Sequence, residues 1–221
     1  VYTKNLRKAK AQISFTKDES NKLNIPKFTY MGFRYVQLSG CEYKEGLLTA
    51  HVIHTSMERT GYFESNHSKI QRVFENQLWG QKSNFIEVPM DCPQRDERMG
   101  YTGDGQVFAL TGAFNYDSRD FWKKYLLDIY KSQLDNKEGY VSPTVPTNGP
   151  SGIGYLSMLG WGNCVTIVPK MLYEQYGDMS YLDRQYESMK KHIDAELRHL
   201  DENGLWMQVN LGDWLVPGRD M

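Results

Sequence analysis

The chain has 221 residues, 40% of them hydrophobic, and a formal net charge of −1 at pH 7. This is enough apolar material for a sizeable core, and the length allows one large domain or two small ones. The balanced charge argues against a nucleic-acid binder, and no apolar run approaches the roughly 20 residues needed to span a bilayer.

Residues 1–60 have the patterns of β-strands. Residues 28–40 are rich in aromatic and β-branched residues and end in turn residues, and residues 47–55 alternate with a period of two. Two or three strands do not easily form an independent sheet. We therefore expect residues 1–60 to be the last strands and the linker of a β-sandwich domain whose earlier strands precede Val1.

From residue 61 onward the hydrophobic period becomes helical, and five helices are expected. They begin after Ser65 or Asn66, at Asp104, after Asp117 or Ser118, at Asn163 and at about Tyr181; the first ends at Gly80, the fourth at Gly177 and the fifth at about Leu200. Their expected apolar faces, except for the fourth, are Ile70, Val73, Phe74 and Leu78; Val107, Leu110 and Phe114; Phe121, Trp122, Tyr125, Leu126 and Ile129; and Leu182, Tyr186, Met189, Ile193 and Leu197. Pro169 inside the fourth helix predicts a kink or a later start.

The segment 87–104, between the first two helices, has no hydrophobic period and carries five acids, two arginines, two prolines and two glycines. Long irregular segments inside a compact domain are usually functional or disordered. The interleaved Met90, Met99 and Tyr101 favour order. We therefore interpret the segment as an acidic active-site loop, with a solvated run of charges as the alternative.

Two further loops combine glycine with aromatic residues. Residues 139–161 are rich in proline and glycine and lead through Trp161 into the fourth helix, and residues 212–215 follow the fifth helix. Consecutive helices with long loops between them predict a helical toroid, in which the loops at one end surround a pocket. A plain helical bundle is the alternative, although its loops are typically shorter.

Four acids of the loop, Asp91, Asp96, Glu97 and Asp104, cannot all ionise in one shielded pocket without cost, because repulsion raises at least one pKa. A carboxyl that stays protonated near neutral pH can serve as a general acid. A second carboxylate opposite it can serve as base or nucleophile, as in glycoside hydrolysis. The loop therefore suits acid–base chemistry on a sugar.

Neighbouring residues fit the same interpretation. Arg95 and Arg98 would keep adjacent acids ionised, which separates the roles within the cluster. Tyr101, Trp161 and Trp214 would form apolar walls against a sugar ring. Together these residue types favour a neutral carbohydrate as the ligand.

Metal and thiol chemistry are not favoured. The spacing of the acids does not match a calcium loop, and no histidine accompanies them. Cys41, Cys92 and Cys164 form neither a disulfide framework nor a zinc pattern. Cys92 is a poor nucleophile, since the neighbouring acids would raise the pKa of its thiol. The sequence predicts no metal and no cofactor.

The run Asp91-Cys-Pro-Gln-Arg-Asp-Glu-Arg-Met-Gly-Tyr-Thr-Gly-Asp104 resembles the signature of glycoside hydrolase family 78, the bacterial α-L-rhamnosidases. Residues 27–36, residues 160–178 and residues 212–215 resemble further blocks of that family, so the resemblance spans most of the chain. It implies a mainly α fold, with residues 61–221 forming the N-terminal part of an (α/α)6 barrel. Residues 1–60 would supply the strands of a preceding β-sandwich.

The resemblance also implies an activity, the removal of terminal α-L-rhamnose with inversion. Glu97 matches the general acid of the family, and Asp96 beside it is expected to be structural, paired with Arg95 or Arg98. The residues that match positions of the sugar site are Asp91, Arg95, Tyr101, Asp104, Trp161, Asp213 and Trp214. Tyr101 stands where the family often has Trp, and Asn163 stands where an Asp is usual, so Asn163 is expected only to cap a helix.

The resemblance places the general base on a later part of the barrel, beyond Met221. We therefore expect the chain to be an excerpt that is inactive alone. A rhamnose-containing oligosaccharide or glycoside is the expected partner, and a homodimer is kept open. The alternatives are a non-catalytic sugar-binding protein and a different (α/α)6 glycosidase or lyase. A periplasmic or secreted location is favoured over a cytoplasmic one.

Overall fold

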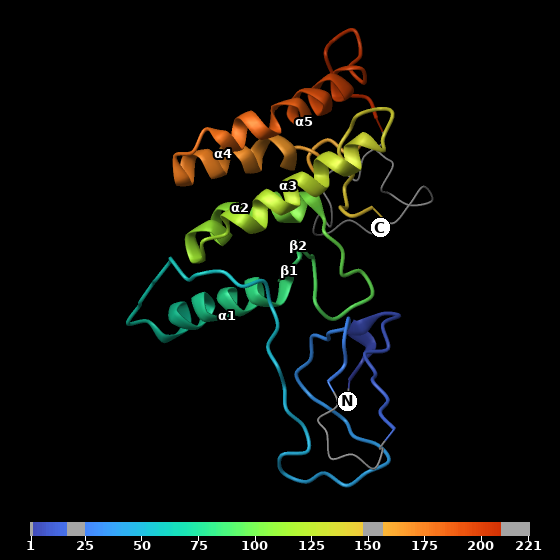
Figure 1. Cartoon of the computed structure of the whole chain (residues 1–221), viewed down its shortest axis with the longest axis vertical. Coiled ribbons are helices and arrows are strands. Elements are labelled where there is room, and N and C mark those ends of the chain that lie inside the picture. Colours follow the sequence, from blue (N-terminus) through green and yellow to red (C-terminus); the bar gives the residue numbers. More distant parts are fainter. Residues whose placement is uncertain (1, 17–24, 148–156, 209–221) are drawn as a thin grey trace.

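The computed structural model describes residues 2–16, 25–147 and 157–208. The elements are a short 3-10 helix η1 (Lys4–Leu6), α1 (Ser68–Asn84), β1 (Phe85–Ile86), β2 (Val88–Pro89), α2 (Thr102–Asn115), α3 (Arg119–Leu134), α4 (Cys164–Tyr176) and α5 (Ser180–Leu197). Helices α2 to α5 gather at one end of the molecule and residues 2–16 and 25–50 lie toward the other, with α1 and the loop after β2 between them (Figure 1). The described part is therefore mainly helical, as the sequence predicts.

The core lies where α4 packs against α2, α3 and α5. Helix α3 contributes the apolar face that the sequence predicts: Phe121, Trp122, Tyr125, Leu126 and Ile129 are all buried. The Phe85 ring of β1 stacks on Phe121, with centroids 4.3 Å apart, and meets Trp122 edge to face. Aromatic pairs of this kind add to the gain from burial alone, so β1 is fixed firmly against α3.

Helix α4 also has the predicted bounds. Asn163 is its N-cap residue, and the left-handed Gly177 ends it, with φ of 72°. Pro169 lies inside the helix without delaying its start. The expectation of a later start is therefore wrong. The helix begins one residue after Asn163, where the turn that carries Trp161 ends.

Helices α1 and α2 bury faces that the sequence did not predict. Ile70 and Val73 of α1 and Val107, Leu110 and Phe114 of α2 are exposed. The buried residues of α2 are instead Thr102, Gly105, Ala109, Gly112, Ala113 and Asn115. Small side chains let the neighbouring elements approach closely: a Cβ at Gly112 would lie 3.1 Å from the Gln81 amide nitrogen.

Gly80 does not end α1, which continues to Asn84. The Gln81 side chain beyond it is buried and donates from Nε2 to the Gly112 carbonyl at 3.1 Å. Its Oε1 accepts a hydrogen bond from the Asn115 amide at 2.8 Å. A glycine inside a helix costs only about 1 kcal/mol relative to alanine, and these two buried hydrogen bonds to α2 offset it.

Helix α5 differs most from expectation. Tyr186, Ile193 and Leu197 are exposed, whereas Leu182 and Met189 are half-buried and Met189 packs against the core. The predicted apolar stripe therefore faces the core only in part. The helix instead buries Tyr181, Gln185, Ser188, His192, Ala195 and Glu196. It ends at Leu197, before the turn at residues 201–204. A polar stripe of this kind is stable in a core only when its groups are hydrogen-bonded.

The strands expected at residues 28–40 and 47–55 are not formed in the described part of the chain. Alternation supplies a strand with two faces but not with a partner, and a strand without neighbours is not stable. Residues 32–58 form backbone hydrogen bonds with the helical part at a few positions. The Gly32 amide donates to the Pro93 carbonyl, Thr55 donates to Phe85, and Asp117 donates to Glu58.

In the part of the chain that the structure describes, no helix combines the length and the apolar character that crossing a bilayer requires. The predicted site residues Asp213 and Trp214 lie outside the described residues.

Candidate active site

The acidic loop is an ordered structure closed at its neck. Asp91 and Met99 face each other across it: the Asp91 amide donates to the Met99 carbonyl at 3.2 Å, and the Met99 amide donates to Asp91 Oδ1 at 2.9 Å. Gly100 anchors the far end, because its carbonyl accepts hydrogen bonds from the Tyr125 hydroxyl and the Val145 amide. A Cβ at Gly100 would lie 2.2 Å from the Val145 carbonyl oxygen, so only glycine fits there.

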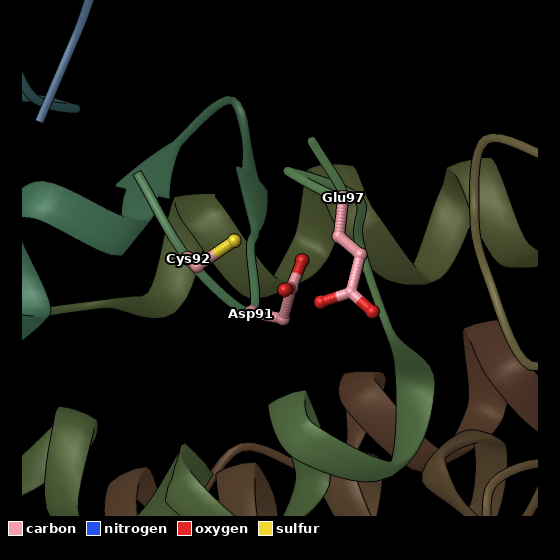
Figure 2. Close-up of side chains that lie close together, drawn as sticks. All are labelled: Asp91, Cys92 and Glu97. Carbon is pink, nitrogen blue, oxygen red and sulfur yellow. The ribbon is translucent and has the colours of Figure 1, made fainter. Parts of the chain in front are cut away.

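Arg95 binds two acids of the loop at once. Its Nε donates to Glu97 Oε2 at 2.6 Å and its Nη2 donates to Asp91 Oδ2 at 3.2 Å. Figure 2 shows the carboxylates of Asp91 and Glu97 turned toward each other. Arg7 reaches the pair from the N-terminal segment, and its Nη1 donates to Glu97 Oε1 at 2.8 Å. Glu97 is therefore paired with two arginines, and Asp91 with one.

The surroundings shift the pKa values of two acids in opposite directions. Burial alone would raise the pKa of Glu97, but the hydrogen bonds from Arg95 and Arg7 outweigh it and lower that pKa. The pKa of Asp104 is raised, chiefly by desolvation of its carboxyl group and further by repulsion from Asp91 and Glu97. Asp104 as a whole residue is exposed. The two acids are therefore in different electrostatic surroundings.

The start of α2 places the next site residues. Tyr101 is the N-cap residue, and Asp104 lies in the first turn, where the positive end of the helix dipole favours a negative charge. The pKa of the Tyr101 hydroxyl is raised by burial and by the charges of Glu97 and Asp91. Tyr101 therefore lies close enough to both acids to feel their charge.

Trp161 contacts the same end of α2. A Cβ built on Gly103 would lie 2.7 Å from the Trp161 indole, so the ring lies against the backbone of that glycine. The Gln106 amide donates to the Gly160 carbonyl at 2.7 Å and holds the turn to α2. The structure thus brings Trp161 to the residue that precedes Asp104, and the ring is only half-buried.

Cys92 does not have the surroundings that a nucleophilic thiol needs. Its side chain is buried, and burial together with a hydrogen bond to Asp91 raises the pKa of its thiol. Potential ligand atoms of Asp91, Cys92 and Glu97 lie within 4.8 Å of one another (Figure 2). Arg95 already binds both carboxylates, and the thiol stays protonated, so this group does not fit a metal ion.

The structure therefore gathers six of the eight predicted site residues in two adjacent groups. Asp91, Arg95 and Glu97 form one group, and Tyr101, Asp104 and Trp161 form the other. Asp96 is exposed and, within the described residues, pairs with neither Arg95 nor Arg98, because Arg95 is engaged by its two other partners. The expected support of Asp96 by an arginine is therefore wrong.

Arg7 is the site residue that the sequence did not reveal, because a single arginine 90 positions before Glu97 carries no pattern.

The sequence predicts that the site loops surround a pocket, but two surface hollows, of about 610 and 580 Å³, lie elsewhere. Both include Asp117 and Arg119 at the junction of α2 and α3, and neither is lined by Glu97 or Asp104. The site acids Asp91, Glu97 and Asp104 therefore line neither of these two hollows.

Comparison with known families identifies the two parts of the chain. The model of the bacterial α-L-rhamnosidase six-hairpin glycosidase domain matches residues 58–221. The model of the bacterial α-L-rhamnosidase concanavalin-like domain matches residues 1–56. An α-L-rhamnosidase of Formosa agariphila is 36% identical over 98% of this chain, and one of Streptomyces avermitilis is 38% identical over 95% of it.

Solved structures give the same relatives. The α-L-rhamnosidase of Aspergillus terreus matches 76% of this chain with a TM-score of 0.69 and 38% identity, and this covers 19% of that protein. The Streptomyces avermitilis enzyme, solved as a complex with L-rhamnose, matches 73% of this chain with a TM-score of 0.68 and 36% identity, which covers 15% of that protein. The chain spans about a fifth of the length of the curated relatives that it matches, 23% and 21% in the two cases above.

Proposed function

Because the chain belongs to the bacterial α-L-rhamnosidase family, we propose that the protein hydrolyses terminal α-L-rhamnose from glycans or plant glycosides. The observation that carries the proposal is the cluster of Asp91, Arg95 and Glu97 next to Asp104 and Trp161. It joins ionisable carboxyl groups, a guanidinium and an aromatic ring at one surface. A sugar needs these same groups, for proton transfer, for its hydroxyls and for its apolar face.

In the proposed mechanism Glu97 donates a proton to the glycosidic oxygen as the bond to the aglycone breaks. Asp91, Asp104 and Arg95 bind rhamnose hydroxyls, and Trp161 and Tyr101 line the ring. An inverting reaction also needs a carboxylate on the opposite side that activates water, roughly 6.5–9.5 Å from the acid. We place this base outside residues 1–221, on the part of the protein that the longer relatives contain.

The low pKa of Glu97 bears on this mechanism, because a general acid must carry a proton before it reacts. Arg7 and Arg95 hold Glu97 ionised in the unliganded arrangement. Rhamnose hydroxyls that bind Arg95 would withdraw its hydrogen bond from Glu97, and the sugar would exclude water, so that both changes raise the pKa of Glu97. The raised pKa of Asp104 makes Asp104 the rival proton donor.

Proton NMR during hydrolysis tests the function directly. The full-length protein is mixed with an α-L-rhamnoside of a simple alcohol, and the anomeric signals are followed before mutarotation. We expect release of rhamnose with the β-anomer first, since inversion reverses the configuration of the α-linkage. Release of the α-anomer first would contradict the inverting mechanism, and no release would contradict the enzymatic function.

A protein that only binds rhamnose is the second candidate, and the ion pairs that keep Glu97 ionised favour it. It predicts binding of L-rhamnose by calorimetry without turnover of any rhamnoside. A different (α/α)6 glycosidase or a lyase would act instead on another sugar, or would release an unsaturated product.

The domain arrangement is part of the same proposal. We place residues 1–60 in a β-sandwich and residues 61–221 in the first half of an (α/α)6 barrel, and the change of family model between residues 56 and 58 supports a boundary near this position. A periplasmic or secreted location stays a prediction, for which an N-terminal export signal in the full-length protein would be the direct evidence.

A further inference from the structure

The buried polar face of α5 joins two segments at one carboxylate. Glu196 is buried, and the Ser157 hydroxyl lies 2.6 and 2.8 Å from its two oxygens and donates its one proton to them. Glu196 Oε2 also accepts from the Trp206 indole N–H at 2.8 Å. Ser157 leads into the turn that carries Trp161, and Trp206 lies on the segment after α5. A buried carboxylate that binds two donors from different segments is a strong anchor.

His192 lies one helical turn before Glu196 and is completely buried. Its Nδ1 accepts a hydrogen bond from the Val141 amide at 3.4 Å and lies 3.7 Å from Glu196 Oε1. The ring packs directly against Gly162: a Cβ built there would lie 2.6 Å from His192 Cε1. Gly162, the residue after Trp161, is therefore supported by the His192 ring.

The turn at residues 158–163 is thus held from two sides. Gly162 meets the His192 ring, and the Trp161 indole meets Gly103 at the start of α2. The Gly162 amide donates to the Met158 carbonyl at 3.0 Å and closes the turn. Trp161 and Gly162 are adjacent in this turn, so we expect a displacement of Gly162 to shift Trp161 as well.

We propose that His192 and Glu196 are positioning residues, which fix this turn and thereby hold the Trp161 ring beside Asp104. The claim rests on the proposed function, in which Trp161 covers one face of bound rhamnose. Neither residue touches the sugar. Their effect reaches the site through Gly162 and Ser157, and it governs how tightly rhamnose binds more than how fast the bond breaks.

Ordinary core packing is the competing explanation, and it predicts a loss of stability without a specific loss of rhamnose affinity. Gly162→Ala separates the two explanations, because the added methyl group strikes the His192 ring and pushes the turn. Gly80→Ala is the matched control, since a Cβ at Gly80 in α1 meets nothing within 4 Å. The double variant Gly162→Ala with His192→Ala removes the ring that the methyl group strikes.

The variants are made in the full-length protein. We expect Gly162→Ala to raise KM and the dissociation constant of free L-rhamnose about tenfold, or about 1.4 kcal/mol, with kcat changed less than about twofold. Gly80→Ala should leave all three values unchanged. The double variant removes the clash but also the His192 ring that holds the turn, so it should recover only part of the lost affinity, with a lower Tm. An unchanged KM in Gly162→Ala, or a double variant that regains the wild-type affinity, would overturn the proposal.

A readout that does not depend on activity keeps the two proposals separate. The protein is labelled with 5-fluorotryptophan, and the fluorine resonance of Trp161 is assigned with Trp161→Phe. Gly162→Ala should shift this resonance and the double variant should restore it only in part; an unshifted resonance in Gly162→Ala would refute the positioning role. Failure of the wild-type protein to bind or hydrolyse rhamnosides would refute the proposed function instead, and the resonance would still decide the positioning claim.

Discussion

At the scale of single residues, the arginines decide the state of the proposed acid. Glu97 has about 30% of its side chain exposed, and it accepts one hydrogen bond from Arg95 and one from Arg7. Charge-assisted hydrogen bonds to the ionised form lower the pKa of a carboxyl. Without a bound sugar these hydrogen bonds therefore favour the ionised form of Glu97, and substrate binding has to raise its pKa before Glu97 can donate a proton.

Substitution of Arg7 tests this charge balance. In the full-length protein Arg7→Met removes one of the hydrogen bonds that lower the pKa of Glu97, so that pKa rises. Activity that needs protonated Glu97 is lost as the pH increases through its pKa. We therefore expect the alkaline limb of the kcat/KM profile, measured on an unactivated rhamnoside, to move to higher pH.

The matched control is Arg72→Met, since Arg72 pairs with the exposed Glu75 on α1 and lies away from the loop acids. Its pH profile should equal that of the wild-type protein. An alkaline limb that stays in place in Arg7→Met would mean that Arg7 does not set the protonation of Glu97 in the working protein.

At the scale of elements, the sequence predicts helices well where large apolar residues form the buried face. Helix α3 buries all five predicted residues, and α4 begins and ends at the predicted residues, although the Asn163 side chain makes no capping hydrogen bond. It fails where small or polar residues form that face. Helix α2 buries its glycines and alanines, and α5 buries a polar stripe, because hydrogen bonds and close approach replace apolar area there. Faces of this kind leave no apolar periodicity in the sequence, so they cannot be predicted from it.

The hydrogen bond between Gln81 and Asn115 allows a test of whether buried polar contacts stabilise the packing of α1 on α2. The two buried amides bond to each other between α1 and α2. Gln81→Met alone or Asn115→Ala alone leaves a buried partner unsatisfied, which costs about 1–3 kcal/mol. We expect the double variant to be less destabilised than the sum of the two single variants, as measured by urea unfolding of the full-length protein.

A strictly additive double variant would contradict the role of this pair, because residues that share a hydrogen bond show an interaction energy in such a cycle. The result would then indicate that Gln81 acts mainly through its second bond, to the Gly112 carbonyl.

At the scale of the whole molecule, the sequence predicted the acids of the site, and that Arg95 would lower the pKa of one acid while repulsion raised that of another, but it did not predict which acid shifts in which direction. The signature run at residues 91–104 locates Asp91, Glu97 and Asp104. Their pKa values depend on Arg7 and on the start of α2, which lie far apart in sequence. The expected strands before residue 60 fail for a related reason, since pairing depends on a neighbour that a local pattern cannot supply.

The share of the relatives that this chain covers leads to a prediction for the 221 residues alone. A general acid without an opposing base cannot complete an inverting hydrolysis. We therefore expect residues 1–221, expressed alone, to release no rhamnose in an overnight assay in which the full-length protein reaches completion. Release at a normal rate would place the base within these 221 residues.

The central claim is that Glu97, and not Asp104, donates the proton. The most direct measurement compares Glu97→Gln and Asp104→Asn in the full-length protein on two rhamnosides, one with a nitrophenol leaving group and one with a simple alcohol. The alcohol needs a proton to leave and the nitrophenolate does not. We expect Glu97→Gln to lose at least about a hundredfold in kcat on the alcohol, to keep most activity on the nitrophenyl substrate, and still to bind L-rhamnose. Asp104→Asn should instead lose rhamnose affinity and affect both substrates alike. The reverse pattern, with the leaving-group effect in Asp104→Asn, would make Asp104 the proton donor and contradict the role of Glu97.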